Sequence, residues 1–146
     1  MKTQKQSVVL VILQFLFVFI LLLSDGSITD NGLSLLLCVI GFGIGIWALI
    51  NNDIYNFNIT PELKESGRLI RKGPYEYSRH PMYLALMIIM LGVSIATNEF
   101  FYYLIFLALV FVLYLKAVRE EYLWNKKSYE YAKYQKRTKM FVPFLF

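Results

Sequence analysis

Cysteine and histidine are almost absent from this sequence. Its 146 residues include one cysteine, Cys38, and one histidine, His80. A disulfide framework needs paired cysteines and a cysteine-based zinc site needs a cluster of them, so neither is predicted. A single histidine likewise excludes a metal site built from several histidines. We therefore expect no resident metal ion.

Charge is also scarce, at 17% of the residues, whereas hydrophobic residues make up 58% and aromatic residues 17%. Soluble domains have about 45–50% apolar residues even when glycine is counted. A chain this short cannot bury so much apolar surface in a water-soluble core, and the mean hydropathy of +0.51 excludes a disordered chain. The composition predicts a polytopic, all-α membrane protein with a single domain over residues 1–146.

Four apolar segments are candidate membrane spans, since a span needs roughly 17–25 residues. They cover residues 7–23, 33–50, 82–97 and 100–118. The third is short, and it can cross if flanking residues snorkel or the bilayer thins. Only Asn98 and Glu99 separate the last two, which predicts a tight antiparallel hairpin. The first segment could instead be a signal-peptide core, but Leu21–Gly26 offers no A-x-A-like cleavage site.

The basic residues predict the orientation of these spans. All of them lie before the first span, between the second and third, or from the end of the fourth onward: Lys2, Lys5, Lys64, Arg68, Arg71, Lys72, Arg79, Lys116, Arg119, Lys126, Lys127, Lys133, Lys136, Arg137 and Lys139. The other side carries Asp25, Asp30 and Glu99. By the positive-inside rule, both termini and the segments 51–81 and 119–146 are cytoplasmic, the second segment being helical. In a prokaryote the membrane would be the cell membrane.

The net charge of +5 does not predict nucleic-acid binding. No zinc-finger or RNP-type motif accompanies the basic residues. Beside membrane spans such residues attract anionic lipid headgroups, so the predicted partner is the bilayer.

Three glycines lie together in the second span, at positions 41, 43 and 45. Gly41 and Gly45 have the small-xxx-small spacing that lets two helix backbones approach closely. The spacing favours helix packing, and the alternative is a thin helix that makes room for a ligand.

The reactive side chains fall in the two cytoplasmic segments. The first contains Gly73-Pro74-Tyr75 and then Arg79-His80-Pro81-Met82-Tyr83. Pro81 suits the first turn of the third span. Arg79 and His80 are therefore expected at the N-terminal end of this span, beside unpaired helix N–H groups. Such a place can bind a carboxylate or phosphate. The alternative is that Arg79 anchors to lipid phosphates and His80 is merely interfacial.

An acidic pair, Glu120 and Glu121, opens the second cytoplasmic segment. Neighbours on a helix point about 100° apart, so one of the two is expected to face the site. Alternatively both lie on a solvated helix, or on an interfacial helix with Tyr131 and Tyr134 in the headgroup layer.

Together these motifs resemble the isoprenylcysteine carboxyl methyltransferase family, which includes phospholipid methyltransferase relatives. The resemblance covers residues 67–143. It rests on the two stretches around Gly73 and His80, the two-span hairpin, the sequence Arg119-Glu120-Glu121, and two tyrosines before Phe141-Val142-Pro143.

The resemblance implies an integral membrane enzyme that transfers a methyl group from S-adenosylmethionine to a lipophilic or lipidated acceptor from the bilayer. It implies catalytic roles for Arg79, Glu120 and Glu121. It also implies these cofactor-binding residues: Gly73, Pro74, Tyr75, Arg79, His80, Pro81, Tyr83, Glu120, Tyr131 and Tyr134.

Of the acidic pair, Glu120 is expected to face the cofactor, because it lies eleven positions before Tyr131, a spacing typical of the family. Glu121 would then face water. The sequence departs from the family at Ala85, where glycine is usual, and at Lys127-Ser128, where Phe-Gly is usual. The acceptor's identity and whether the protein forms a homo-oligomer are left open.

Two other functions fit the same features. One is an NADPH-dependent membrane reductase of the sterol or enoyl type, and the other is a non-catalytic adaptor whose basic tail contacts lipid. The cofactor that stabilises the purified protein distinguishes the three, because a ligand that binds only the folded state raises the melting temperature.

Overall fold

The computed structural model describes residues 2–52, 58–63 and 67–142. It contains four long helices and one short one: α1 (Lys2–Leu22), α2 (Gly32–Asn51), α3 (Pro81–Thr97), α4 (Phe100–Lys127) and α5 (Tyr129–Arg137). Two short 3₁₀ helices, Ile28–Asp30 and Gly73–Glu76, complete the described secondary structure, which includes no strand. The predicted all-α fold is confirmed.

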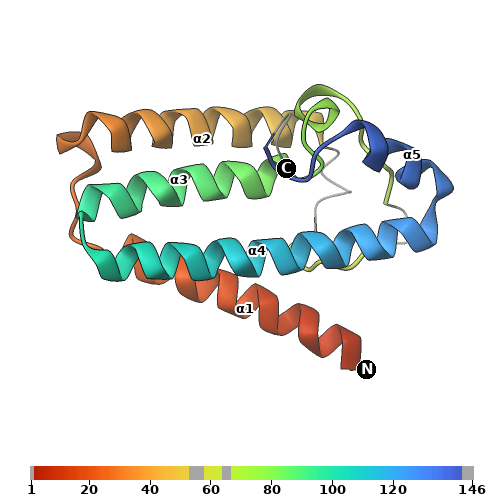
Figure 1. Ribbon diagram of the computed structural model, residues 1–146, viewed down its shortest axis with the longest axis horizontal. Coiled ribbons are helices and arrows are strands. Elements are labelled where there is room, and N and C mark those ends of the chain that lie inside the picture. The colour runs from red at the N-terminus through yellow and green to blue at the C-terminus, as the bar shows by residue number, and fades with distance from the viewer. Residues whose placement is uncertain (1, 53–57, 64–66, 143–146) are drawn as a thin grey trace.

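The long helices lie side by side in the order α2, α3, α4, α1, each antiparallel to its chain neighbour (Figure 1). A buried apolar cluster joins α1, α3 and α4 through Leu21, Met90, Val93, Leu109 and Leu113. Burial of such side chains contributes roughly 1.5–3 kcal/mol each, and this cluster holds the bundle together at the end away from α5.

Three of the helices, α1, α2 and α4, are long and apolar enough to cross a membrane. The fourth, α3, has 17 residues and therefore measures about 25 Å, somewhat less than a hydrocarbon core of about 30 Å. Large apolar side chains such as Phe19 and Phe42 are 59% exposed on the outer faces of α1 and α2. A continuous apolar exterior suits lipid, so this is a membrane protein.

The helix ends differ from the expected span ends. α1 begins at Lys2 and α4 continues to Lys127, beyond the apolar segments that start at residue 7 and stop at residue 118. Hydropathy marks where a helix leaves lipid and not where the helix itself ends. Lys, Glu and Leu are good helix formers, so α4 continues past the apolar segment to Lys127 without a break.

Gly41 lies at a close approach of α2 and α3. A Cβ added there would lie 2.5 Å from Cγ1 of Ile89 and 2.9 Å from the backbone oxygen of Ala85. Gly45 also faces Ala85, whereas a Cβ at Gly43 would meet no described atom within 4 Å. The packing interpretation is confirmed for Gly41, whereas at Gly45 an added Cβ would make an ordinary contact with Cβ of Ala85, at 3.6 Å.

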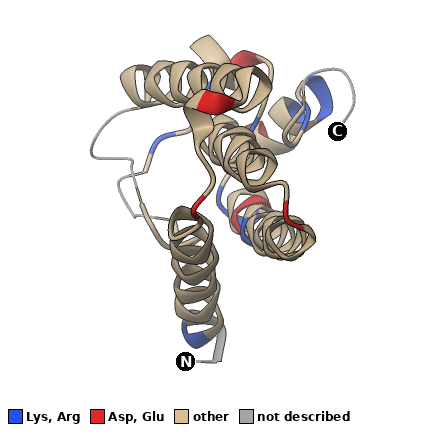
Figure 2. Cartoon of the chain, turned by 90° about the vertical axis from the view of Figure 1, so that its left-hand side faces the viewer, with Lys and Arg blue, Asp and Glu red and all other residues tan. Residues whose placement is uncertain are grey.

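The hairpin between α3 and α4 is as tight as predicted. Asn98 caps α3 in the left-handed conformation, with φ 51° and ψ 26°, and Glu99 leads directly into α4. Asparagine tolerates this conformation better than most residues. The connections at this end, which face the viewer in Figure 2, carry Asp25, Asp30 and Glu99.

Candidate functional site

The reactive residues meet at the opposite end of the bundle, on the right of Figure 1, where α2 ends, α3 begins and α5 folds back over α4. Gly73 makes the first turn with a φ of +61°, and an added Cβ would lie 2.5 Å from the side-chain amide carbon of Asn51. Both observations require glycine there. Buried Pro74 is the second residue of the 3₁₀ helix Gly73–Glu76, which leads toward α3.

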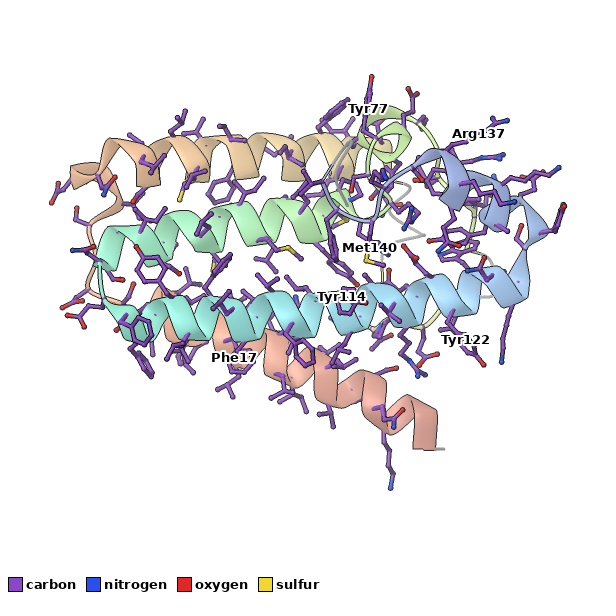
Figure 3. The ribbon with its side chains drawn as sticks, in the orientation of Figure 1. Phe17, Tyr77, Tyr114, Tyr122, Arg137 and Met140 are labelled. Atoms are coloured by element: carbon purple, nitrogen blue, oxygen red, sulfur yellow. The ribbon has the colours of Figure 1, made fainter. Side chains whose placement is uncertain are left out.

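The chain after α5 lies against the residues that precede α3. The backbone N–H of Arg79 donates to the Lys139 carbonyl at 2.8 Å, and that of His80 donates to the Met140 carbonyl at 3.1 Å. Ser78 Oγ also donates to the Met140 carbonyl, at 3.1 Å. Figure 3 shows Met140 beside the start of α3. The C-terminal segment thus covers the N-terminal end of α3. Pro143, part of the expected motif, lies outside the described residues.

Arg79 links the segment before α3 to α4 and to the C-terminal part of the chain. Its Nε donates to Oε1 of Glu121 at 2.6 Å, and both side chains are less than a tenth exposed. One terminal nitrogen, Nη1, donates to the backbone oxygens of Gln135 and Thr138 in and after α5. A buried, hydrogen-bonded ion pair of this kind is rigid, and removing one partner leaves the other charge uncompensated.

His80 lies between the two glutamates. Its Nδ1 is 3.4 Å from Oε2 of Glu120, and its Nε2 is 3.3 Å from Oε1 of Glu121. Burial lowers the pKa of His80, but the hydrogen bonds and charges of both carboxylates outweigh it and raise the pKa above its usual value near 6.5. The imidazolium form therefore persists to higher pH than in an exposed histidine.

Glu121 was expected to face water, but in the structure it is buried. It is 5% exposed, and Gln135 Nε2 donates to its Oε2 at 2.7 Å. The expectation was wrong because α5 and the C-terminal segment cover the side of α4 that an isolated helix would leave solvated. Glu120 is turned toward His80 as well, and its Oε1 accepts a hydrogen bond from the hydroxyl of Tyr83.

A cavity of about 290 Å³ lies among these groups, close to the lower end of the roughly 300–1,000 Å³ usual for small-molecule sites. Gly73, Pro74 and Glu121 stand behind its wall, where they position other residues. The remaining expected site residues line it: Tyr75, Arg79, His80, Pro81, Tyr83, Glu120, Tyr131 and Tyr134.

Aromatic rings form the wall of the cavity beside α5. Trp124 stacks on Tyr131 with ring centroids 5.8 Å apart and planes within 15°. The hydroxyl of Tyr134 donates to the backbone oxygen of Tyr75 at 2.5 Å, and burial raises its pKa to about 12, so this phenol stays neutral. Trp124 was not predicted, although it follows Glu120 by one helical turn, which places both on one face of α4.

A described loop, residues 58–63, closes the cavity on another side. Glu62 Oε1 accepts hydrogen bonds from Ser7 Oγ of α1 and from Arg119 Nη2 of α4, each at 2.6 Å. Burial alone would raise the pKa of Glu62, but Ser7 and Arg119 together hold it below its usual value. Nothing in the sequence singled out Glu62, because its partners are more than fifty positions away.

Lys116 lies at the end of the cavity nearest the membrane. The sequence placed it in the basic flank of the fourth span, but its side chain is turned inward and is 1% exposed. Residues Lys116, Glu120 and Trp124 are spaced by four and all line the cavity. The i, i+4, i+8 spacing of two charges and a tryptophan was the available signal.

The family model for phospholipid methyltransferases matches residues 30–132, from the approach to α2 into α5. The chain belongs to the phospholipid methyltransferase family. This match covers more than half of the chain and includes nearly every residue lining the cavity. A comparison with curated proteins finds no match. Membership of the phospholipid methyltransferase family makes this a membrane methyltransferase and supports neither the reductase nor the adaptor alternative.

Proposed function

We propose that this phospholipid methyltransferase family member transfers a methyl group from S-adenosylmethionine to a lipophilic acceptor that enters from the bilayer. One observation carries the proposal. A single cavity has charged and aromatic groups at its α5 end and apolar side chains, including Phe15, Met82 and Leu86, at its membrane end.

The charged end suits the amino-acid part of the cofactor. A carboxylate can accept a charge-assisted hydrogen bond from Nη2 of Arg79, an atom with no other hydrogen-bond partner among the described residues. The His80 imidazolium, whose two N–H groups face Glu120 and Glu121, adds its positive charge nearby. Glu120 can accept hydrogen bonds from an ammonium group or ribose hydroxyls. The side chains facing the cavity therefore supply a partner for each charge of the zwitterion.

The aromatic wall suits the rest of the cofactor. Tyr131 and Trp124 offer flat faces on which an adenine can stack. A sulfonium is a cation and is attracted to the face of an aromatic ring, for which Tyr75 and Tyr83 are placed. The bound cofactor supplies an electrophilic methyl group. The protein's part is to hold both reactants in line, and such positioning accounts for much of the barrier lowering in two-substrate reactions.

Methyl transfer and cofactor choice can be tested together. Purified protein and native membranes incubated with methyl-labelled S-adenosylmethionine should yield label in the lipid fraction. At a hundred times its dissociation constant, the cofactor should stabilise the folded protein by about 2.7 kcal/mol and raise the melting temperature. NADPH at the same concentration is the control and should not raise it. Stabilisation by NADPH and no labelled product would contradict the proposal.

We also propose that the cavity opens on the cytoplasmic side, with both termini there, because the basic residues gather at that end. A green fluorescent protein fused after residue 146 should fluoresce, and an alkaline phosphatase at the same point should be inactive. A phosphatase fused in the connection at Asp25 to Asp30 should be active and serves as the matched control. The reverse pattern would overturn this orientation.

A further inference from the structure

Lys116 is one of the largest fully buried side chains described in this protein. A lysine near the end of a membrane span usually extends its side chain toward the interface and keeps its ammonium in water. Here the side chain turns into the bundle instead. Ionisable residues inside a membrane protein are rare, face a cavity or a partner, and mark functional positions.

The hydrogen-bond partners of Lys116 are both neutral, and the nearest carboxylate, that of Glu120, makes no ion pair with it. Its Nζ donates to Oε1 of Gln14 at 2.5 Å and to the backbone oxygen of Ile59 at 3.0 Å, and it lies 5.2 Å from the ring centroid of Tyr83. Both oxygens are neutral. Among the ion pairs of the described residues, none includes Lys116.

An ammonium group has three N–H donors, so one of them remains for a ligand. A buried charge without a directly bonded counterion is costly, and an anion bound to Lys116 in the cavity would lower that cost. The amide NH₂ of Gln14, which also lines the cavity, is a second donor to the same anion. These two residues come from α4 and α1, are hydrogen-bonded to each other and lie side by side in the wall of the cavity.

The position of Lys116 separates it from the proposed cofactor site. It precedes Glu120 by four residues, about 6 Å along the helix axis toward the membrane. Tyr83 lies between the two, since its hydroxyl bonds to Glu120 and its ring lies near the Lys116 ammonium. Apolar Phe15 and Leu86 line the cavity at this end. An anion bound here would carry its hydrocarbon chain into the apolar part.

We propose that Lys116, with Gln14, binds an anionic group at the polar end of the acceptor, either a carboxylate or a phosphate ester, and so selects acidic amphiphiles. The proposal rests on the proposed methyltransferase function, because it assigns the acceptor end of the same cavity. Lys116 is then a specificity-determining residue that fixes how deeply the acceptor enters.

Three probes with one chain length test this selection: tetradecanoate, tetradecyl phosphate and tetradecanol. Each is titrated calorimetrically into the protein in phosphatidylcholine nanodiscs, without cofactor, and into empty nanodiscs. At least one acid should bind ten times more tightly than the alcohol. Lys116→Gln should remove that advantage and Lys116→Arg should keep most of it. Lys126→Gln is the matched control, since Lys126 is exposed on the same helix beside Tyr122, and it should change nothing.

A second measurement needs no substitution and applies even if Lys116→Gln fails to fold. In the wild-type protein, the acid that binds should slow acylation of Lys116 by an amine-reactive reagent, relative to Lys126, as measured by mass spectrometry. Whichever acid binds and protects identifies the headgroup as carboxylate or phosphate.

Equal binding of acids and alcohol, or an acid preference that survives in folded Lys116→Gln, would overturn the inference, and so would unchanged acylation. Titration of S-adenosylmethionine into the same samples separates the two proposals. Cofactor binding without acid preference rejects the role of Lys116 alone, whereas acid preference without cofactor binding rejects the methyltransferase proposal on which it rests.

Discussion

Arg79→Ala is expected to cause the largest loss, in stability and in cofactor binding together. The substitution leaves buried Glu121 without its ion-pair partner and removes the donor to two backbone oxygens of the C-terminal part. Removing one partner of a buried pair costs about 3–5 kcal/mol. Chemical unfolding in detergent should show this loss, and calorimetric titration of S-adenosylmethionine should show no measurable binding.

The matched control is Arg71→Ala. Arg71 pairs with Glu130 at 3.0 Å, but the two side chains are 51% and 65% exposed, so the loss should be within about 1 kcal/mol. Arg79→Lys should rescue little, because lysine lacks the planar fork that reaches a carboxylate and backbone oxygens at once. An Arg79→Ala protein as stable as Arg71→Ala, with normal cofactor affinity, would reject both the linking role and the binding role.

Substitution of the two adjacent glutamates by glutamine should give opposite results. Glu120 lines the cavity, so Glu120→Gln should weaken cofactor binding by about 1.5–3 kcal/mol, the value of a hydrogen bond to a charged group, with a small change in stability. Glu121 lies behind the wall and neutralises Arg79 and His80. Glu121→Gln should therefore lower the free energy of unfolding, by up to about 3–5 kcal/mol.

Unfolding curves and cofactor titrations should be measured on the wild type, Glu120→Gln and Glu121→Gln, so that changes in stability and in affinity can be compared. Glu130→Gln is the control for an exposed glutamate nearby and should stay within ±0.5 kcal/mol. If the two variants instead lose affinity and stability in equal proportion, the division between a cofactor-facing Glu120 and a structural Glu121 is wrong.

The bundle was predictable from the sequence because hydropathy reports burial in lipid directly. Four apolar segments, a two-residue hairpin at Asn98 and Glu99, and the packing face at Gly41 all follow from local composition and spacing. The ends of α1 and α4 do not follow, because polar helix formers continue a helix past the membrane.

The candidate site was predictable only in part. Motif residues such as His80, Glu120 and Tyr134 do lie around one cavity. What local reasoning could not give is the fold-back of α5, which buries Glu121 and turns an exposed helix face into an interior. Glu62 and Lys116 were missed for a similar reason, since their partners Arg119 and Gln14 are distant in sequence.

The pairing of residues 78–80 with Lys139 and Met140 has a consequence for the order of events during synthesis. A ribosome makes α1 to α4 before the C-terminal segment that contains Lys139 and Met140. Segments that are synthesised first can fold first. A nascent chain can therefore hold a packed bundle while Arg79 and His80 still lack their last backbone partners. The candidate site is completed only after Lys139 and Met140 have been synthesised, so translation products that stop before them would hold the helices without a finished site.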